Sequence, residues 1–257
     1  MATKNVPATT TEAPLPMALD NSAFADDMGA GFEETSQADY AIPFLSILQA
    51  LSPQCTIGDS AYDEDCRPGM FFNSVTQEHY SGKDGVMFVP ALYARKGMLW
   101  VPKNQGGGFR GTVELSRLES AMSDCERDEN TGDYINHDGL ALVDTREWYG
   151  LLIDGDTITA VLMSLSKTQL KKSKRWLTLA QGIRHNGKPM PLFSQVYKLT
   201  TVPESNDKGS WMGLEFKHAG TVPSMEIFEE AKSFREMILS GQAKATMPVG
   251  VDEEDPF

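Results

Sequence analysis

"TREWYGLLIDGDTITAVLM" spans residues 145–163 and carries the strongest structural signal in the chain. Two runs rich in β-branched, aromatic and aliphatic residues flank Asp154-Gly155, the residue pair that a type I′ turn requires. This pattern predicts a β-hairpin. We therefore expect a fold that is built from antiparallel strands joined by tight turns.

Other segments have the same character. Further strands are predicted at 69–80, 85–95 and 97–102, and a second hairpin pairs 194–202 with 210–218 around the turn "PESNDKG". Short helices are predicted at 39–53, where Phe44, Leu48 and Leu51 would share a face, and at 112–123. Many strands and few helices favour a mainly β (α+β) fold, an antiparallel barrel or sandwich with helical insertions.

A helix is also predicted at 224–241. Ser224 is a suitable N-cap, Gly241 follows the last turn, and an apolar stripe is formed by Ile227, Ala231, Phe234 and Ile238. The expected organisation is a disordered acidic segment (1–38), a domain (39–222) with a basic insertion (164–191), the C-terminal helix (223–241), and a flexible leash with an acidic tip (242–257).

Charge is segregated along the chain. The net charge is −13, yet residues 157–203 contain eight basic residues and no acid. Within this block, "SLSKTQLKKSKRW" predicts a helix that Ser166 caps and that runs to about Ala180, with cations on one side and Leu170, Trp176 and Leu177 on another. A solvated amphipathic helix is the alternative, although solvated faces usually mix both signs.

Cations beside aromatic residues suit single-stranded nucleic acid, because phosphates need positive charge and unpaired bases stack on rings. The predicted phosphate ligands are Lys171, Lys172, Lys174, Arg175, Arg184, Lys188, Arg110 and Lys103. The predicted stacking residues are Trp176, Phe109 and Trp100. Phe109 lies within the glycine-rich segment 103–111, which is either a phosphate cradle or a flexible loop.

The sequence ends in "VDEEDPF". Four carboxylates can mimic a short phosphate track and compete for the basic helix, and a terminal ring with its carboxylate can fit a partner's basic-rimmed pocket. A solubilising tail is the alternative. The predicted partner-binding residues are Asp252, Glu253, Glu254, Asp255, Pro256 and Phe257.

This tip resembles that of bacterial single-stranded DNA-binding proteins, and the layout resembles the single-stranded DNA-binding proteins of short-tailed phages. The segments "AIPFLSILQALSP", "TQLKKSKRW" and "LTTVPESNDKGSW" are similar to a group of phage replication-region proteins, over residues 24–220. The resemblance implies an OB-fold, sequence-independent binding of single-stranded DNA in replication, recombination and repair, and recruitment of partner enzymes through the tail. The long acidic N-terminus and the basic helical insertion depart from the bacterial type.

Other classes of protein fit less well. Cys55, Cys66, His79 and Cys125 lack the close spacing of a structural zinc site, so we expect no metal, no cofactor and no disulfide. Common catalytic signatures are absent, which favours a binding protein over an enzyme. No signal peptide or membrane span is recognised, so we expect the cytoplasm, here of an infected host. A virion structural protein and a strand-annealing mediator remain alternatives.

Overall fold

The computed structural model describes residues 23, 26–27, 30–35, 41–129, 132–207 and 209–243. The chain divides into two units, Met1–Ser36 and Gln37–Phe257, and all the named strands and helices belong to the second. The predicted disorder of residues 1–38 falls mostly outside the described residues and stays a prediction. The second unit is mainly β, with three α-helices in the part of the chain that is described.

The hairpin that the sequence predicts is formed by β8 (Ala141–Asp154) and β9 (Thr157–Ser166). Their antiparallel ladder runs from Asp154 opposite Thr157 to Thr145 opposite Ser166, so the turn consists of Gly155 and Asp156. Gly155 has φ 57°, whereas Asp156 stays at negative φ. A type I′ turn needs positive φ at both positions, so that expectation was wrong; glycine first is the type II′ pattern.

β4 (Val86–Trp100) is the longest strand and pairs with β8 from Met87 opposite Ile153 to Trp100 opposite Ala141. A register shift between Pro90 and Leu92 bends it, as a bulge does beside a proline that cannot donate to the ladder. The sequence predicted two strands here, 85–95 and 97–102, and this division was wrong. Gly97 lies within the continuous ladder, and a Cβ there would lie 2.7 Å from side-chain atoms of Leu118 and Leu142, so glycine leaves room for these two side chains.

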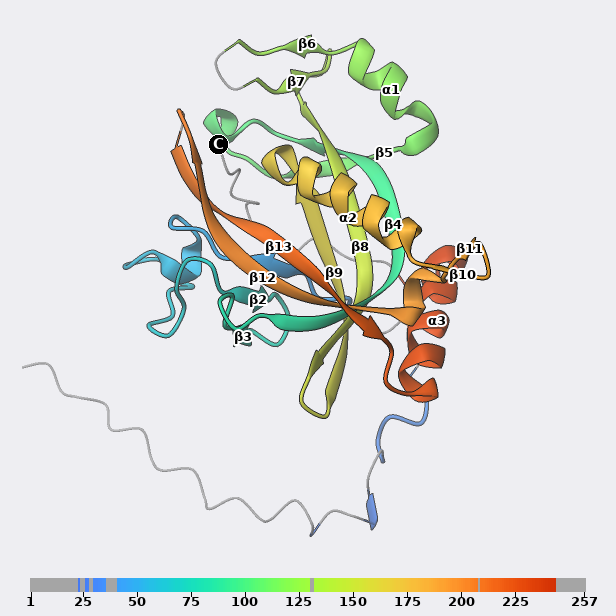
Figure 1. The fold of residues 1–257 in the computed structure, drawn as a ribbon. Helices are drawn as coiled ribbons and strands as arrows, with labels where there is room; N and C mark the ends of the chain where they lie inside the picture. Colours follow the sequence, from blue (N-terminus) through green and yellow to red (C-terminus); the bar gives the residue numbers. More distant parts are fainter. Residues whose placement is uncertain are drawn as a thin grey trace, which may run out of the picture. The chain divides into compact units, whose positions relative to one another are not determined.

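The two ends of β4 have different neighbours. β12 (Gln195–Asn206) pairs with residues 86–88 and with β13 (Gly209–Thr221), while β5 (Phe109–Glu114) pairs with residues 96–100. The sheet order is β13-β12-β4-β8, with β9 on one half of the outer edge of β8 and the short pair β7 (Tyr134–Ile135) and β6 (Glu126–Arg127) on the other. The result is a curled antiparallel half-barrel, an architecture compatible with an OB-like fold (Figure 1).

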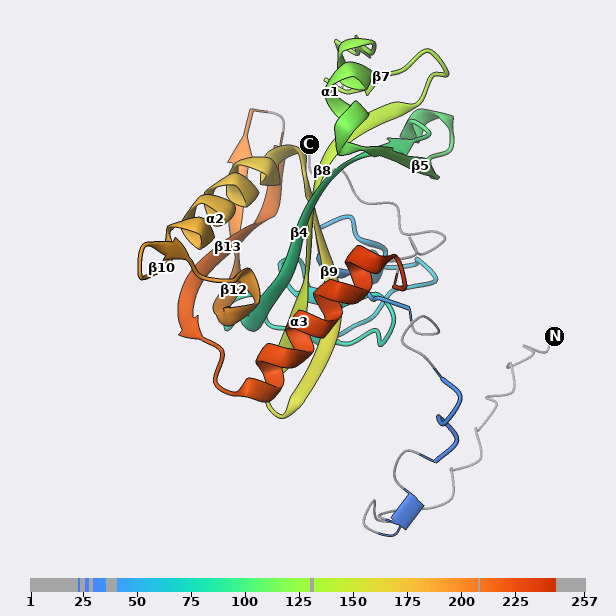
Figure 2. The same ribbon diagram turned by 90° about the vertical axis from the view of Figure 1, so that its right-hand side faces the viewer.

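Each face of this sheet is covered by one helix. α2 (Leu170–Gly182) crosses one face and α3 (Met225–Ser240) packs on the opposite face, as the two views show (Figures 1 and 2). Along β9, Val161 and Met163 belong to the cluster around α2, whereas Leu162 belongs to the cluster around α3. Period-two alternation in a strand therefore feeds two separate cores.

Residues 43–49 close the open side of the half-barrel. The Leu162 N–H of β9 donates to the Pro43 carbonyl at 2.9 Å, while the Gln49 side chain exchanges two hydrogen bonds with the Met212 backbone of β13. The segment contains β1 (Leu45–Ile47), so the predicted helix at 39–53 was wrong. Phe44 and Leu45 enter opposite cores, which is a strand pattern, and Leu51 is 65 % exposed.

The remaining elements largely match the sequence. α1 (Leu115–Ser123) lies within the predicted 112–123, and α3 has the Ser224 side chain accepting from Ile227 N–H, with Gly241 left-handed at its end. Between α1 and β8, the acidic segment 124–139 contains the short strands β6 and β7. The other elements are β2 (Phe71–Asn73), β3 (His79–Tyr80), β10 (Arg184–His185) and β11 (Lys188–Pro189).

The centre of the larger core is Trp176 of α2, which is fully buried. We expect Trp176→Ala to lower the free energy of unfolding by about 3–5 kcal/mol, because truncating a buried aromatic leaves a cavity. Leu179→Ala, on the same helix but 41 % exposed, should cost less than about 1 kcal/mol. Urea unfolding followed by far-UV circular dichroism measures both; equal losses would contradict this assignment of the core.

Candidate nucleic-acid interface

The inner side of α2 fixes which of its residues face outward. Ser173, Trp176 and Ala180 are buried, and the Trp148 Nε1–H of β8 donates to Ser173 Oγ at 2.9 Å. The helix begins after a 3-10 turn at Lys167–Gln169, and the predicted cap Ser166 makes no side-chain capping bond. Instead, Gln169 Oε1 accepts from the Leu214 N–H of β13 at 3.0 Å, which ties the start of the helix to the sheet edge.

Trp176 cannot stack a DNA base in this structure, so that expectation was wrong. One face of its indole lies against Trp148, with ring centroids 4.1 Å apart and planes within 9°. The other face lies on Phe216 of β13, at 5.2 Å and 18°. Both π-faces are therefore used inside the protein, and Trp176 is the anchor of α2 to the sheet.

The outward side of α2 carries the cations. Lys171, Lys174 and Arg175 are exposed, and so are Arg184 and Lys188 on the β10–β11 hairpin that follows the helix. Arg184 Nη1 donates to the Gly187 carbonyl at 2.8 Å, within that hairpin. Lys171, Lys174, Arg184 and Lys188 form no ion pair with a described acidic residue. We call these four residues the basic surface.

Lys172 and Arg175 differ from the basic surface because acids from distant strands reach them. Lys172 Nζ lies 2.9 Å from Glu204 Oε1 and also pairs with Glu215, and all three side chains are less than a third exposed. Burial lowers the pKa of Lys172, but the two carboxylates outweigh it and raise the pKa above its ordinary value. Arg175 pairs with Glu215 at 3.5 Å and lies over the Phe216 ring. Lys172 therefore forms ion pairs within the protein that join α2 to β12 and β13.

A second candidate group lies at the other end of β4. Trp100 and Phe109 form an edge-to-face pair with centroids 5.5 Å apart, and Phe109 is 37 % exposed. The turn between them uses Gly106, Gly107 and Gly108 at φ 104°, 67° and 111°, which only glycine adopts readily. Arg110 is exposed and follows Phe109 in the chain. The structure does not describe the side chain of Lys103.

The two groups are not brought into one cluster. β5 lies at the end of the sheet with α1, β6 and β7, whereas the β10–β11 hairpin follows the opposite end of α2 (Figures 1 and 2). Within the described ranges, no hydrogen bond or ion pair joins the basic surface to Trp100, Phe109 or Arg110. The predicted tail residues Asp252 to Phe257 lie outside the described residues, so their role stays a prediction.

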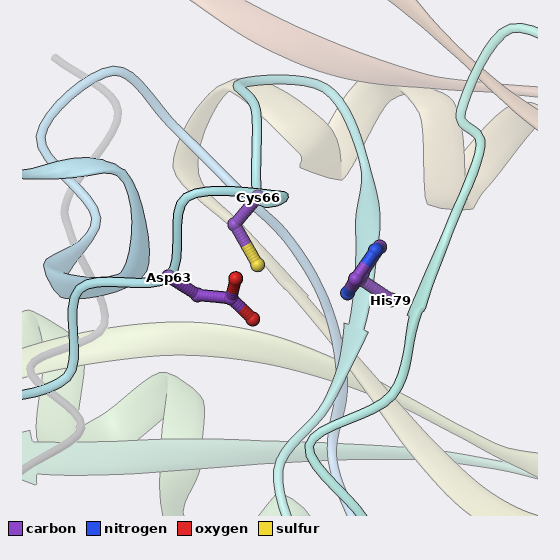
Figure 3. Close-up of side chains that lie close together, drawn as sticks. All are labelled: Asp63, Cys66 and His79. Atoms are coloured by element: carbon purple, nitrogen blue, oxygen red, sulfur yellow. The ribbon is translucent and has the colours of Figure 1, made fainter. Parts of the chain in front are cut away.

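The structure also brings Cys66 and His79, which are not closely spaced in the sequence, together with Asp63. Asp63, Cys66 and His79 place potential metal-ligand atoms within 4.8 Å of one another (Figure 3). Burial raises the pKa of Cys66 to about 11, with further contributions from Asp63 and Cys55. The sequence signal for this group is the Asp63-x-x-Cys66 spacing, in which a carboxylate stands where a zinc motif usually has a second thiol.

Lys171 and Lys172 are adjacent on α2 and test the difference between an exposed cation of the basic surface and a cation held by an ion pair. We expect Lys172→Gln to lower the free energy of unfolding by about 1–3 kcal/mol, because two partly buried carboxylates lose their partner. Lys171→Gln, one residue away, exposed and outside the ion-pair network, should change it by less than about 0.5 kcal/mol. Equal effects in urea titrations would show that both lysines are simply solvated.

Comparisons with known proteins identify a family. No described helix is long and apolar enough to cross a bilayer. No curated protein and no solved structure matches the sequence. A family model described as "Pam3 phage gp34-like protein" matches residues 9–244, which include every strand and helix from β1 to α3. Because the match covers most of the chain, the protein belongs to the Pam3 phage gp34-like protein family, a family of phage proteins.

Proposed function

We propose that this phage protein binds single-stranded DNA without sequence specificity, through the basic surface, during phage DNA replication, recombination and repair. In this proposal it acts as a binding protein in the host cytoplasm and not as an enzyme. The observation that carries the proposal is the exposure of Lys171, Lys174, Arg184 and Lys188 along one continuous segment, residues 171–188, that contains no acid.

The geometry suits a nucleic-acid backbone. α2 has 13 residues and is therefore about 20 Å long, enough for several consecutive phosphates. Three of the four cations of the basic surface are lysines. A lysine ammonium is a mobile point charge, whereas the planar guanidinium of arginine can form paired hydrogen bonds with a base edge. Contacts of this kind position a strand without selecting its sequence, which supports binding that is independent of sequence.

Base stacking is assigned to Trp100 and Phe109. Their edge-to-face pair exposes part of Phe109 beside the Arg110 cation, the combination of ring and charge that single-stranded DNA-binding surfaces use. Every base has a π-face, so stacking here also tolerates any sequence. A single DNA strand that contacts both the basic surface and the Trp100–Phe109 pair would run along α2 and continue toward β5.

The basic surface can be tested by replacing all four of its cations with glutamine. Affinity for fluorescent oligo-dT, measured by anisotropy, should fall, and the slope of log K against log salt should flatten by about 3, since each lost phosphate contact removes about 0.7. A matched control changes four other exposed cations, with the same loss of charge: Lys83, Arg117, Arg127 and Lys217.

Equal losses in the two quadruple variants would mean that only overall charge matters, and absence of binding by the unmodified protein would overturn the proposal. Copurification with virions without DNA affinity would then favour a structural role. Duplex DNA of the same length should bind more weakly than oligo-dT. Acceleration of complementary-strand pairing would extend the proposal to strand annealing.

Stacking has its own optical signature. Oligo-dT should quench tryptophan fluorescence, and Trp100→Phe should remove most of that quenching, because Trp148 and Trp176 are buried. Phe109→Ala should weaken binding about 5–150-fold, the equivalent of one lost stack. Trp211→Phe is the matched control, since its Nε1–H donates to Glu204 at 3.0 Å within the protein. Quenching that survives in Trp100→Phe would remove Trp100 from the binding surface.

A further inference from the structure

The chain between β1 and β2 is long and irregular. Residues 48–70 contain one 3-10 turn, Pro53–Cys55, and no other helix or strand. Irregular loops of this length inside a compact domain are uncommon and usually functional. A few backbone bonds fold the segment on itself, among them Asp63 N–H to the Gln54 carbonyl at 3.0 Å and Gly69 N–H to the Leu48 carbonyl at 2.7 Å.

Two side chains of this loop meet one side chain of β3. Asp63 and Cys66 come from the loop and His79 from the strand, and their carboxylate, thiol and imidazole surround one small space (Figure 3). All the candidate ligand atoms lie within 4.8 Å of one another. His79 is fixed by the pairing of its backbone with Phe72 of β2, and Cys66 packs with Phe72 in a small apolar cluster.

Sulfur, nitrogen and oxygen donors together are the ligand set of a borderline-soft cation. Zinc binds a thiolate at about 2.3 Å and imidazole or carboxylate at about 2.0–2.2 Å, so tetrahedral ligand atoms lie roughly 3.3–3.8 Å apart. The ligand atoms of Asp63, Cys66 and His79 lie within 4.8 Å of one another, so small side-chain rotations would bring them to that spacing. Three protein ligands leave one coordination position for water or another group.

The surroundings provide access and orientation. Asp63 and His79 line a surface pocket whose walls include Glu78 and Asp154, two acids that favour a cation. Asp63 Oδ1 accepts from the Asp65 N–H at 2.9 Å, the kind of contact that holds a ligating carboxylate in place. Neither ring nitrogen of His79 has a hydrogen-bond partner among the described residues.

We propose that Asp63, Cys66 and His79 bind a divalent transition-metal ion of the zinc class. The bound ion fastens the irregular loop 48–70 to β3 and keeps one coordination position open to the pocket. The site is independent of the DNA-binding proposal, since it involves neither the basic surface nor the Trp100–Phe109 pair.

The test uses the full-length protein without an affinity tag, stripped with a chelator and kept reduced by a phosphine. Titration with Co²⁺ should give a thiolate-to-cobalt charge-transfer band and visible ligand-field bands that saturate at one equivalent. Zn²⁺ should displace the cobalt and erase both bands. Zn²⁺ at about a hundredfold excess over its Kd should raise Tm by roughly 5–10 °C.

Variants identify the ligands. Cys66→Ser should remove the charge-transfer band, and Asp63→Asn and His79→Gln should weaken binding by more than the roughly 10–100-fold that an outer contact contributes. Asp63 and His79 are partly exposed, so their variants test the site even if the buried Cys66 is needed for folding. Cys125→Ser and His137→Gln, a thiol and an imidazole elsewhere, should bind like the unmodified protein.

Several outcomes would overturn the proposal. One is the absence of a saturable cobalt–thiolate band in the unmodified, folded protein. Another is equal weakening in the site variants and the Cys125 and His137 controls, which would indicate diffuse binding to acidic surface. If the unmodified protein did not bind DNA, the cobalt and zinc titrations would still give the same answer, so each proposal can fail without the other.

Discussion

The stack of Trp148, Trp176 and Phe216 is the interaction on which the rest of the structure depends. Its three rings come from β8, α2 and β13, so one helical side chain joins the middle of the sheet to its edge. Phe88 and Tyr197 add edge-to-face contacts to the same indole. Because the helix is held at this point, its rotation is fixed, and Lys171 and Lys174 face solvent as a consequence.

The same stack changes how an OB-like sheet can be used. α2 and its tryptophan fill the inner face of the half-barrel, and α3 fills the outer face with Ile227, Ala231 and Phe234. In the part of the chain that the structure describes, a helix therefore packs on each face of the sheet. The exposed cations of the basic surface lie on the helix that covers the sheet and on the hairpin after it, and the Trp100–Phe109 pair lies at the ends of strands β4 and β5.

Local signals were enough to predict the elements that local contacts determine. Gly155 marks the β8–β9 turn, and Ser224 and Gly241 mark the ends of α3, because each satisfies or permits backbone geometry within a few residues. β1 was misread because its contacts are non-local: it pairs with β2, and the residues on either side of it, Pro43 and Gln49, bond to Leu162 and Met212, more than a hundred positions away. Trp176 was misread for the same reason: its neighbours Trp148 and Phe216 belong to other elements, so its burial could not be seen from the lysines beside it.

The positions of the charged residues in the sequence do not show which of them form ion pairs in the folded protein. The eight cations of 157–203 form an acid-free block in the sequence, yet folding pairs Lys167 with Asp133 and Lys172 with Glu204 and Glu215. Exposed charges beyond about 8 Å are largely screened at physiological salt, so the net charge of −13 has little influence on a phosphate at α2. The same screening lets the acid-lined pocket beside His79 favour a cation on a chain that also presents a basic helix. Binding preference on this protein is therefore set by neighbours in space within one Debye length, and each surface has to be judged by its own local balance of charge.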